Sequence, residues 1–486
     1  MRGQDIHFFI YNQPSSRNPK IYIHSLHSIS YIMERKTCIA MVPSPELSHL
    51  IPLVELARRL VLHHHDLHVT LLIPTLVPLT ASMKALLNTL PPNTNFTVLP
   101  QVKIEDLPHN INPVTKWKLI VQHSTPFIHE ALTSLISSTR LVALVYDMFS
   151  FDAHHVAKKL NLLSYLFFIS GAVVLSFSLS SFPKLDESVC VSSEFLSDSI
   201  ETVNVPGCAV AFHVKELPEP VLYGRSSETY RSVLDVFHKI SLVDGVLVNT
   251  FTDLEAGAIR ALQEREGPCV YPVGPIIMTE SSSEENKLLC LRWLNNQPPS
   301  SVLYVSFGSV GTLSYDLLNE LAFGLEMSGH KFLWVVRAPL EYLPSGFLDR
   351  TKTQGLVVTS WAPQIEILGH ASTGGFLSHC GWSSTLESVV NGVPMIVWPL
   401  FAEQRMNAKI ITDALKIGVR PKVDGETGMV KREEIARGVK RIMEGDESLE
   451  ICRRVKELSD GAAAALSEHG SSRNAISSLA LKWNNL

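Results

Sequence analysis

The sequence predicts an α/β protein made of two doubly wound domains in tandem. Its 486 residues suit two domains of roughly 200–250 residues each. Short apolar runs alternate with helical patterns along most of the chain, which is typical of largely parallel sheets covered by helices. A hydrophobic fraction of 45% and a charged fraction of 18% are ordinary for a globular protein with large buried cores.

The first half opens with a β-α-β unit. Residues 37–42 form a short apolar run that is typical of a buried strand, apolar residues recur at helical spacing over 50–61, and residues 68–73 form the next apolar run. The crossover between two such parallel strands is expected to be right-handed. Further strands of this half are predicted at 141–146, 165–169 and 245–249.

A Ser- and Glu-rich stretch, TESSSEEN at 279–286, interrupts the alternation and has the composition of a linker. The alternation then restarts, with Ser314 as a predicted helix N-cap. Strands are predicted at 302–306, 332–336, 356–359, 376–378 and 395–398, and helices at 432–443 and 448–466. We therefore divide the chain into an N-terminal extension outside the fold (1–33), a first domain (34–277), a linker (278–290), a second domain (291–460) and a C-terminal helix that packs back on the first domain (461–486).

Composition and charge exclude several classes of protein. A net charge of −5 and a pI of about 6.4 argue against nucleic acid or an anionic membrane surface as the main partner. No apolar run approaches the roughly 18–20 residues of a membrane span. The seven cysteines are widely spaced, which indicates reduced thiols in a cytoplasmic protein and no zinc site. Adjacent histidines at 63–65 do not share a helix face, so no metal is expected there.

The most informative segment is 361–404. Within it, the predicted strand 376–378 leads into HCGWSS at 379–384 and then into a helix that is expected to begin near Ser384. A helix start presents unpaired backbone N–H groups and the positive end of the helix dipole, and Gly381 lets an anion approach the backbone. This turn is therefore predicted to hold a diphosphate, with side-chain donors from His379, Ser383 and Ser384.

Other side chains of the segment suit the remaining parts of a nucleotide sugar. Trp361 follows a predicted strand and offers a flat face for a heteroaromatic base. Gln364 and Glu387 can hydrogen-bond ribose hydroxyls, and Glu403 and Gln404 can read sugar hydroxyls. A nucleotide-dependent oxidoreductase also fits the layered pattern, but no G-x-G-x-x-G follows the first strand of either half.

The segment closely resembles the signature box of plant secondary-product UDP-glycosyltransferases. Its W-A-P-Q opening, H-C-G-W centre, S-T-L-E, G-V-P and closing E-Q all align, and the stretches VSFGS at 305–309 and LPSGF at 343–347 are also family-like. The similarity extends over nearly all of the chain after Met33 and is strongest to a hydroquinone-glucosyltransferase-like branch that acts on simple phenols and monolignols. It implies a GT-B fold, in which two Rossmann-like domains face each other across a cleft.

The resemblance also implies a role for each residue of the donor site. Trp361 would stack on uracil, and the backbone of Ala362 would hydrogen-bond to it. Gln364 and Glu387 would hold the ribose, and Glu403 and Gln404 would bind glucose, with Trp382 nearby. The diphosphate would be bound by His379, Ser384, Ser309 and the backbone of Gly381 and Trp382. The reaction implied is an inverting transfer of glucose from UDP-glucose to a hydroxyl of a phenolic acceptor of monolignol, hydroquinone or flavonoid type. No metal and no further cofactor is expected. The same groups would also suit another hexose.

A catalytic pair is predicted in the first domain. Inverting transfer needs a base to take the acceptor proton, and a His held by a carboxylate suits this task. His49 lies in the loop after the first strand and Asp147 ends the run at 141–146, so both are expected at the carboxyl edge of one sheet. The stretches VPSP at 42–45 and VYDMF at 145–149 match the family's catalytic His motif and the strand that carries its partner Asp.

Some residues depart from the family pattern. Relatives usually carry Gly at the positions of Glu46 and Ser48 and often at Val310, and Asn at that of Ser383. Glu46, Phe149 and Phe151 are assigned to the acceptor pocket, with core packing as the alternative for the two rings. The departures leave a second hypothesis open, a UDP-sugar-binding protein with weak or no turnover. Nothing in the sequence fixes the acceptor, and the protein is expected to be a monomer.

Overall fold

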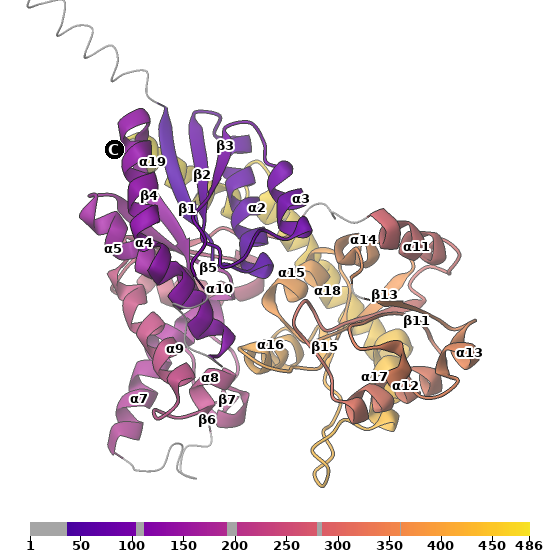
Figure 1. The fold of residues 1–486 in the computed structure, drawn as a ribbon. Coiled ribbons are helices and arrows are strands. Elements are labelled where there is room, and N and C mark those ends of the chain that lie inside the picture. The colour runs from indigo at the N-terminus through magenta and orange to yellow at the C-terminus, as the bar shows by residue number, and fades with distance from the viewer. Residues whose placement is uncertain (1–35, 104–110, 192–201, 279–283, 360) are drawn as a thin grey trace, which may run out of the picture.

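The structure is a computed structural model that describes residues 36–103, 111–191, 202–278, 284–359 and 361–486. It consists of two α/β domains, each with a parallel sheet between layers of helices (Figure 1). The prediction of two doubly wound domains is therefore confirmed. The N-terminal extension predicted at 1–33 lies outside the described residues.

The first domain is built on a seven-stranded parallel sheet with the order β3-β2-β1-β4-β5-β8-β9. Its strands are β1 (Thr37–Val42), β2 (Leu67–Ile73), β3 (Thr94–Val98), β4 (Arg140–Asp147), β5 (Leu163–Phe168), β8 (Gly245–Val248) and β9 (Cys269–Pro272). The chain leaves β1 for β2 on one side and later returns to β4 on the other. The loops after β1 and β4 therefore open at one point of the carboxyl edge, where doubly wound sheets bind their ligands.

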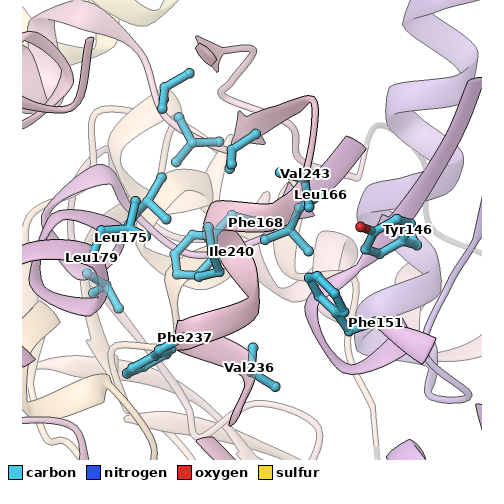
Figure 2. Packing of buried hydrophobic residues seen from close by; sticks show 14 of the residues in the cluster. Tyr146, Phe151, Leu166, Phe168, Leu175, Leu179, Val236, Phe237, Ile240 and Val243 are labelled. Atoms are coloured by element: carbon cyan, nitrogen blue, oxygen red, sulfur yellow. The ribbon is translucent and has the colours of Figure 1, made fainter. Parts of the chain in front are cut away.

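Alternate residues of β1 serve the two faces of this sheet. Cys38, Ala40 and Val42 belong to one hydrophobic core, and Ile39 and Met41 belong to the other. Successive side chains of a strand point to opposite faces, so a strand covered by helices on both sides reads as one continuous apolar run. Figure 2 shows part of the first of these cores, where aromatic and aliphatic side chains interlock.

The first domain contains helices α2 to α10, of which α2, α4, α5 and α10 contact the sheet, while α7, α8 and α9 lie together at one end of the domain (Figure 1). These helices are α2 (Leu47–His63), α3 (Ala81–Asn88), α4 (Pro113–Ser138), α5 (Asp152–Lys159), α6 (Ala172–Ser176), α7 (Phe182–Val191), α8 (Glu219–Leu222), α9 (Glu228–Lys239) and α10 (Thr252–Glu264). A short antiparallel pair, β6 (Thr202–Val203) and β7 (Phe212–His213), lies between α7 and α8 in the chain.

The second domain repeats the plan with a six-stranded sheet of order β12-β11-β10-β13-β14-β15. Its strands are β10 (Val302–Ser306), β11 (Lys331–Val336), β12 (Gly355–Thr359), β13 (Thr373–Ser378), β14 (Met395–Val397) and β15 (Gly418–Val419). Its helices are α11 (Glu284–Leu294), α12 (Tyr315–Ser328), α13 (Phe347–Thr351), α14 (Gln364–Leu368), α15 (Trp382–Val390), α16 (Gln404–Lys409) and α17 (Arg432–Met443). Ser314 caps α12 as predicted, because its side chain accepts from the N–H of Leu317.

Two long helices end the chain and differ from the predicted boundaries. Helix α18 (Gly445–Leu466) contacts α15 of the second domain and α10 of the first, and α19 (Ser471–Asn484) lies on the first sheet (Figure 1). The buried ring of Trp483 is 5.3 Å from that of Tyr165. The predicted linker at 278–290 is too long, since α11 already begins at Glu284 and buries Cys290 and Leu294 one turn apart.

Candidate active site

The loops after β1 and β4 bring His49 and Asp147 together. Helix α2 begins at Leu47, so His49 lies in its first turn, and Asp147 is the last residue of the neighbouring strand β4. His49 Nδ1 is 2.9 Å from Asp147 Oδ2. The His49 side chain is largely buried, and Asp147 is 0% exposed. A buried carboxylate on Nδ1 fixes the ring and leaves Nε2 as the nitrogen that can accept a proton.

The second oxygen of Asp147 is also held. Its Oδ1 accepts a hydrogen bond from the backbone N–H of Phe149 at 3.0 Å and a short one from the hydroxyl of Ser44. Ser44 is buried and comes from the loop after β1. The carboxylate thus contacts three donors, which fix its orientation toward His49 and compensate for the free-energy cost of its burial.

Two aromatic rings stand against the imidazole of His49. The ring centroid of Trp117 on α4 is 5.2 Å away and that of Phe149 is 5.4 Å away, while the two aromatic rings are 5.6 Å from each other. Both are partly exposed and form an apolar wall beside the base. Sequence reasoning had not singled out Trp117, because a Trp within a helix pattern carries no sign that its ring will reach a distant loop.

Charged neighbours raise the pKa of His49. Burial alone lowers it, but the carboxylate of Asp147 and then those of Glu46 and Glu403 outweigh burial, so the pKa lies above the ordinary 6.5. Glu46 is the N-cap residue of α2, whereas Glu403 belongs to the second domain, just before α16. Glu403 Oε1 accepts from Ser170 of the first domain at 3.4 Å, and burial raises its pKa. The imidazole of His49 in one domain therefore faces a carboxylate of the other.

The predicted diphosphate turn lies at the start of α15. Cys380 has a φ of 66°, Gly381 is the N-cap, and α15 begins at Trp382, two residues before the predicted start. The ring of His379 is wedged between two glycines, because an added Cβ at Gly308 or Gly381 would lie 2.6 or 2.5 Å from ring atoms. There is consequently no room for a side chain beside this imidazole at either glycine.

His379 is a neutral imidazole with an open nitrogen. It is buried, and burial lowers its pKa to about 4. Its Nδ1 is buried without a hydrogen-bond partner among the residues that the structure describes. A buried polar atom of this kind calls for a partner from outside the chain. Its position beside the N-terminus of α15 suits an anionic group.

The side chains predicted to hold a ribose form one network. Gln364 Nε2 donates to Ser384 Oγ at 2.9 Å and to Glu387 Oε2 at 2.6 Å, and Tyr304 donates to Gln364 Oε1 at 3.3 Å. Burial raises the pKa of Glu387 to about 7. Half-buried Trp361 lies at the same edge of the sheet, and its carbonyl accepts from Asn286 at 2.6 Å. The buried Ala362 follows it.

Trp382, which the resemblance places near the sugar, contacts the first domain in this structure. Its indole Nε1 donates to the carbonyl of Asn249 in the first domain at 2.6 Å, and the residue is only 4% exposed. The ring also packs on Gly171, where an added Cβ would lie 2.8 Å from it. Trp382 thus fastens the start of α15 to the first domain.

The remaining predicted residues are Gln404, Ser309 and Ser383 of the donor site and Phe151 of the acceptor pocket. Gln404 is buried, with Oε1 accepting from the N–H groups of Leu400 and Phe401 at 2.9 and 3.0 Å, so its amide NH₂ is the end left for a ligand. Ser309 is exposed after β10, and Ser383 is partly buried in the first turn of α15. Phe151, assigned to the acceptor pocket, is instead a core residue. It is 3% exposed and packs on Tyr146 at 5.4 Å (Figure 2).

The described residues form neither a metal site nor a membrane-spanning helix. Within the described ranges, no group of three or more His, Cys, Asp or Glu side chains is placed to hold a metal ion. His64 of the cluster at 63–66 is 3.2 Å from Ser477 Oγ on α19. No helix in the part of the chain that the structure covers is long and apolar enough to cross a membrane.

Comparison with known proteins agrees with this geometry. Residues 272–449 match the family described as UDP-glucoronosyl and UDP-glucosyl transferase. The sequence is 46% identical to a hydroquinone glucosyltransferase of Rauvolfia serpentina, over 93% of this chain and 99% of that protein. It is 44% identical to UDP-glycosyltransferase 72B2 of Arabidopsis thaliana, over 92% of this chain and 96% of the relative.

Solved structures are similar over the same extent. The glycosyltransferase UGT2 of Phytolacca americana, complexed with UDP-2fluoro-glucose and pterostilbene, superposes with a TM-score of 0.86 at 46% identity, covering 92% of this chain and 99% of that one. UGT71G1 of Medicago truncatula, complexed with UDP-glucose, gives a TM-score of 0.83 at 29% identity, over 93% and 99% of the two chains. The chain therefore belongs to the plant UDP-glycosyltransferases and is an enzyme with the GT-B arrangement of two Rossmann-like domains.

Proposed function

We propose that this enzyme transfers glucose from UDP-glucose to a hydroxyl of a small phenolic acceptor, with inversion at the anomeric carbon and with His49 as the base. The observation that carries the proposal is the 2.9 Å pair of His49 Nδ1 and Asp147 Oδ2 beside the second domain's Glu403. The glucose donor and phenolic acceptor are also supported by the hydroquinone glucosyltransferase among the relatives.

The transfer is a single displacement. The acceptor oxygen forms a bond to the anomeric carbon while its proton moves to His49 Nε2, and the bond from that carbon to the β-phosphate oxygen breaks. Asp147 stabilises the imidazolium that results. UDP-glucose is an α-glycoside, so attack from the opposite face gives a β-glucoside. UDP departs with the electron pair of the broken bond.

The second domain would hold the donor. We assign the uracil to Trp361 and the backbone of Ala362, and the ribose to Gln364 and Glu387. The diphosphate would lie on the N-terminus of α15, with hydrogen bonds from Nδ1 of neutral His379 and from the hydroxyls of Ser384, Ser383 and Ser309. Preorganised donors of this kind stabilise the charge that develops on the leaving UDP. Glu403 and the free amide of Gln404 would bind glucose hydroxyls.

The first domain would hold the acceptor. Trp117 and Phe149 offer an apolar aromatic wall next to Nε2 of His49, and a flat phenol packs well on such rings. Glu46, at the N-cap of α2, adds a carboxylate whose charge acts on His49. We further propose that the enzyme needs no metal or cofactor and is a cytoplasmic monomer. The cytoplasmic assignment is supported by the thiols of Cys38, Cys208, Cys269, Cys290, Cys380 and Cys452, which are all unpaired.

The test is an assay with UDP-glucose and hydroquinone, read by UDP release and by the mass of the product. Wild type is expected to add one hexose as a β-glucoside, identified by its proton NMR coupling, and His49→Ala is expected to lose at least about 10³-fold in kcat/KM. His155→Ala removes an exposed imidazole from α5 and serves as the matched control. Failure to glucosylate any of a panel of phenols, or full activity of His49→Ala, would refute the proposal.

A further inference from the structure

The imidazole of His49 is surrounded by carboxylates from three separate elements. Asp147 ends β4, Glu46 caps α2, and Glu403 precedes α16 in the opposite domain. All three raise the pKa of His49, and the charged groups that act on it most strongly are all acidic. Asp147 is fully buried and satisfied by its three donors, and Glu403 is assigned to the sugar, which leaves Glu46 without a role in the reaction.

Glu46 lies on the same side of its helix as the base. It is the N-cap residue and His49 is the third residue of the helix, a spacing at which side chains are neighbours. The N–H of His49 donates to the carbonyl of Glu46 at 3.1 Å, which fixes the two backbones together. The side chain of Glu46 is partly exposed, and its Oε1 accepts from the N–H of Leu47 at 3.2 Å. A partly exposed carboxylate is thus held near the imidazole of His49.

The lysines nearest in sequence to the aromatic wall do not offset that charge. Lys116 and Lys118 flank Trp117 on α4, but adjacent residues of a helix do not face the same way. Lys118 forms an ion pair with Asp235 of α9 at 3.1 Å, and Lys116 is exposed. The side of α4 that meets His49 therefore contributes the indole of Trp117 rather than a cation.

We propose that Glu46 is a specificity determinant that makes the enzyme select phenols without an anionic substituent over phenols that carry a carboxylate. This inference rests on the proposed function, since it concerns the acceptor of that reaction. A carboxylated phenol that places its hydroxyl on His49 brings a second negative charge into the partly desolvated site near which Glu46 is held, and like charges repel more strongly there than in water. Selectivity of this kind comes from a repulsive element built against the wrong substrate.

Three acceptors with matched phenol groups test the proposal. 4-Hydroxyphenylacetamide and 4-hydroxyphenylacetate differ in the charge of one side group, which a methylene separates from the ring. Tyramine carries an ammonium at the end of a two-carbon chain on the same phenol. Wild type is expected to show a kcat/KM for the amide roughly 10-fold or more above that for the carboxylate, with the ammonium compound at least equal to the amide. Because all three share one phenol, a change in the strength of the base moves their rates together and leaves their ratio unchanged.

Variants then assign the selectivity to Glu46. Glu46→Gln removes the charge at nearly constant shape, and Glu46→Asn does so with a residue favoured at helix N-caps. Both are expected to bring the amide-to-carboxylate ratio to within about 3-fold of unity. Glu130→Gln, which removes the same charge from an exposed position on α4, is the control and should leave the ratio unchanged.

The outcomes separate this inference from the proposed function. A wild type that glucosylates the amide and the carboxylate equally well, or a ratio that Glu46→Gln and Glu46→Asn leave intact, overturns the role of Glu46 while the glucosyltransferase assignment stands. Absence of turnover with all three acceptors and also with hydroquinone and the phenol panel overturns the proposed function itself. In wild type, the ratio of kcat/KM for the amide to that for the carboxylate should also shrink as ionic strength rises, because salt screens the accessible charge of Glu46. A ratio that salt does not change would count against the proposal.

Discussion

Two buried histidines occupy comparable places in the two domains, and their surroundings give them opposite properties. His49 follows β1 and His379 follows β13, and each lies between a strand end and a helix start at the carboxyl edge of its sheet. The pKa of His49 is raised above 6.5, whereas the pKa of His379 is lowered to about 4.

The difference comes from what each ring touches. His49 bonds a carboxylate and has two more carboxylates nearby, so its charged form is stabilised in spite of burial. His379 is enclosed by Gly308 and Gly381, and burial, which disfavours the charged imidazolium, lowers its pKa. One residue type therefore suits the two tasks that we propose, a base that takes up a proton in the first domain and a neutral hydrogen-bond donor in the second.

The largest effect should come from removing the carboxylate that makes the first histidine a base. Asp147→Asn keeps the shape but cannot stabilise the imidazolium, so kcat/KM should fall by roughly 10³-fold with little change in affinity for UDP. Steady-state kinetics and calorimetric titration with UDP measure the two quantities. Asp446→Asn, at an exposed position in α18, is the control. An active Asp147→Asn enzyme would mean that His49 does not depend on this partner.

A smaller effect is expected at the second histidine. His379→Ala should weaken UDP binding by roughly 10-fold, since it removes one hydrogen bond to the diphosphate. Because the pKa of His379 is about 4, this imidazole stays neutral from pH 5.5 to 8. The loss caused by His379→Ala should then be the same across that range. A penalty that grows as the pH falls toward 6 would show that His379 binds as a cation and would remove the contrast with His49.

The smallest effect concerns the pH dependence of the base. The base must be neutral to act, so kcat/KM should fall as the pH drops through a midpoint above 6.5 in wild type. Glu46→Gln removes one carboxylate that raises the pKa of His49, and its midpoint should lie at lower pH. A pH series with 4-hydroxyphenylacetamide, whose side group does not titrate, measures both curves. Coincident midpoints would show that Glu46 does not influence the imidazole.

Much of the fold could be predicted because both sheets are covered on two faces. Strand β1 begins and ends at the predicted residues, since each of its residues is buried and every residue after Thr37 is apolar. Strand β3 was missed, because it is an edge strand with one buried residue and the sequence TNFTV shows no apolar run. Strand β15 has two residues and is too short to leave a pattern.

The candidate site could be predicted where one local segment carries the groups, and not where distant segments meet. Gln364, Ser384 and Glu387 lie within one signature box, and the structure joins them directly. Trp117 reaches His49 only because α4 crosses the end of β4, and the indole of Trp382 finds Asn249 only because the domains touch. Tertiary contacts of this kind produce no regular residue spacing or motif that the sequence alone would show.

The most direct measurement is a crystal structure of the enzyme with an unreactive UDP-glucose analogue and 4-hydroxyphenylacetamide bound together. We expect the phenolic oxygen about 3 Å from His49 Nε2 and the diphosphate at the start of α15, bonded by His379 Nδ1, with the anomeric carbon between them. A diphosphate in that place with the phenol bound away from His49, or with Nε2 turned from it, would refute the proposed mechanism.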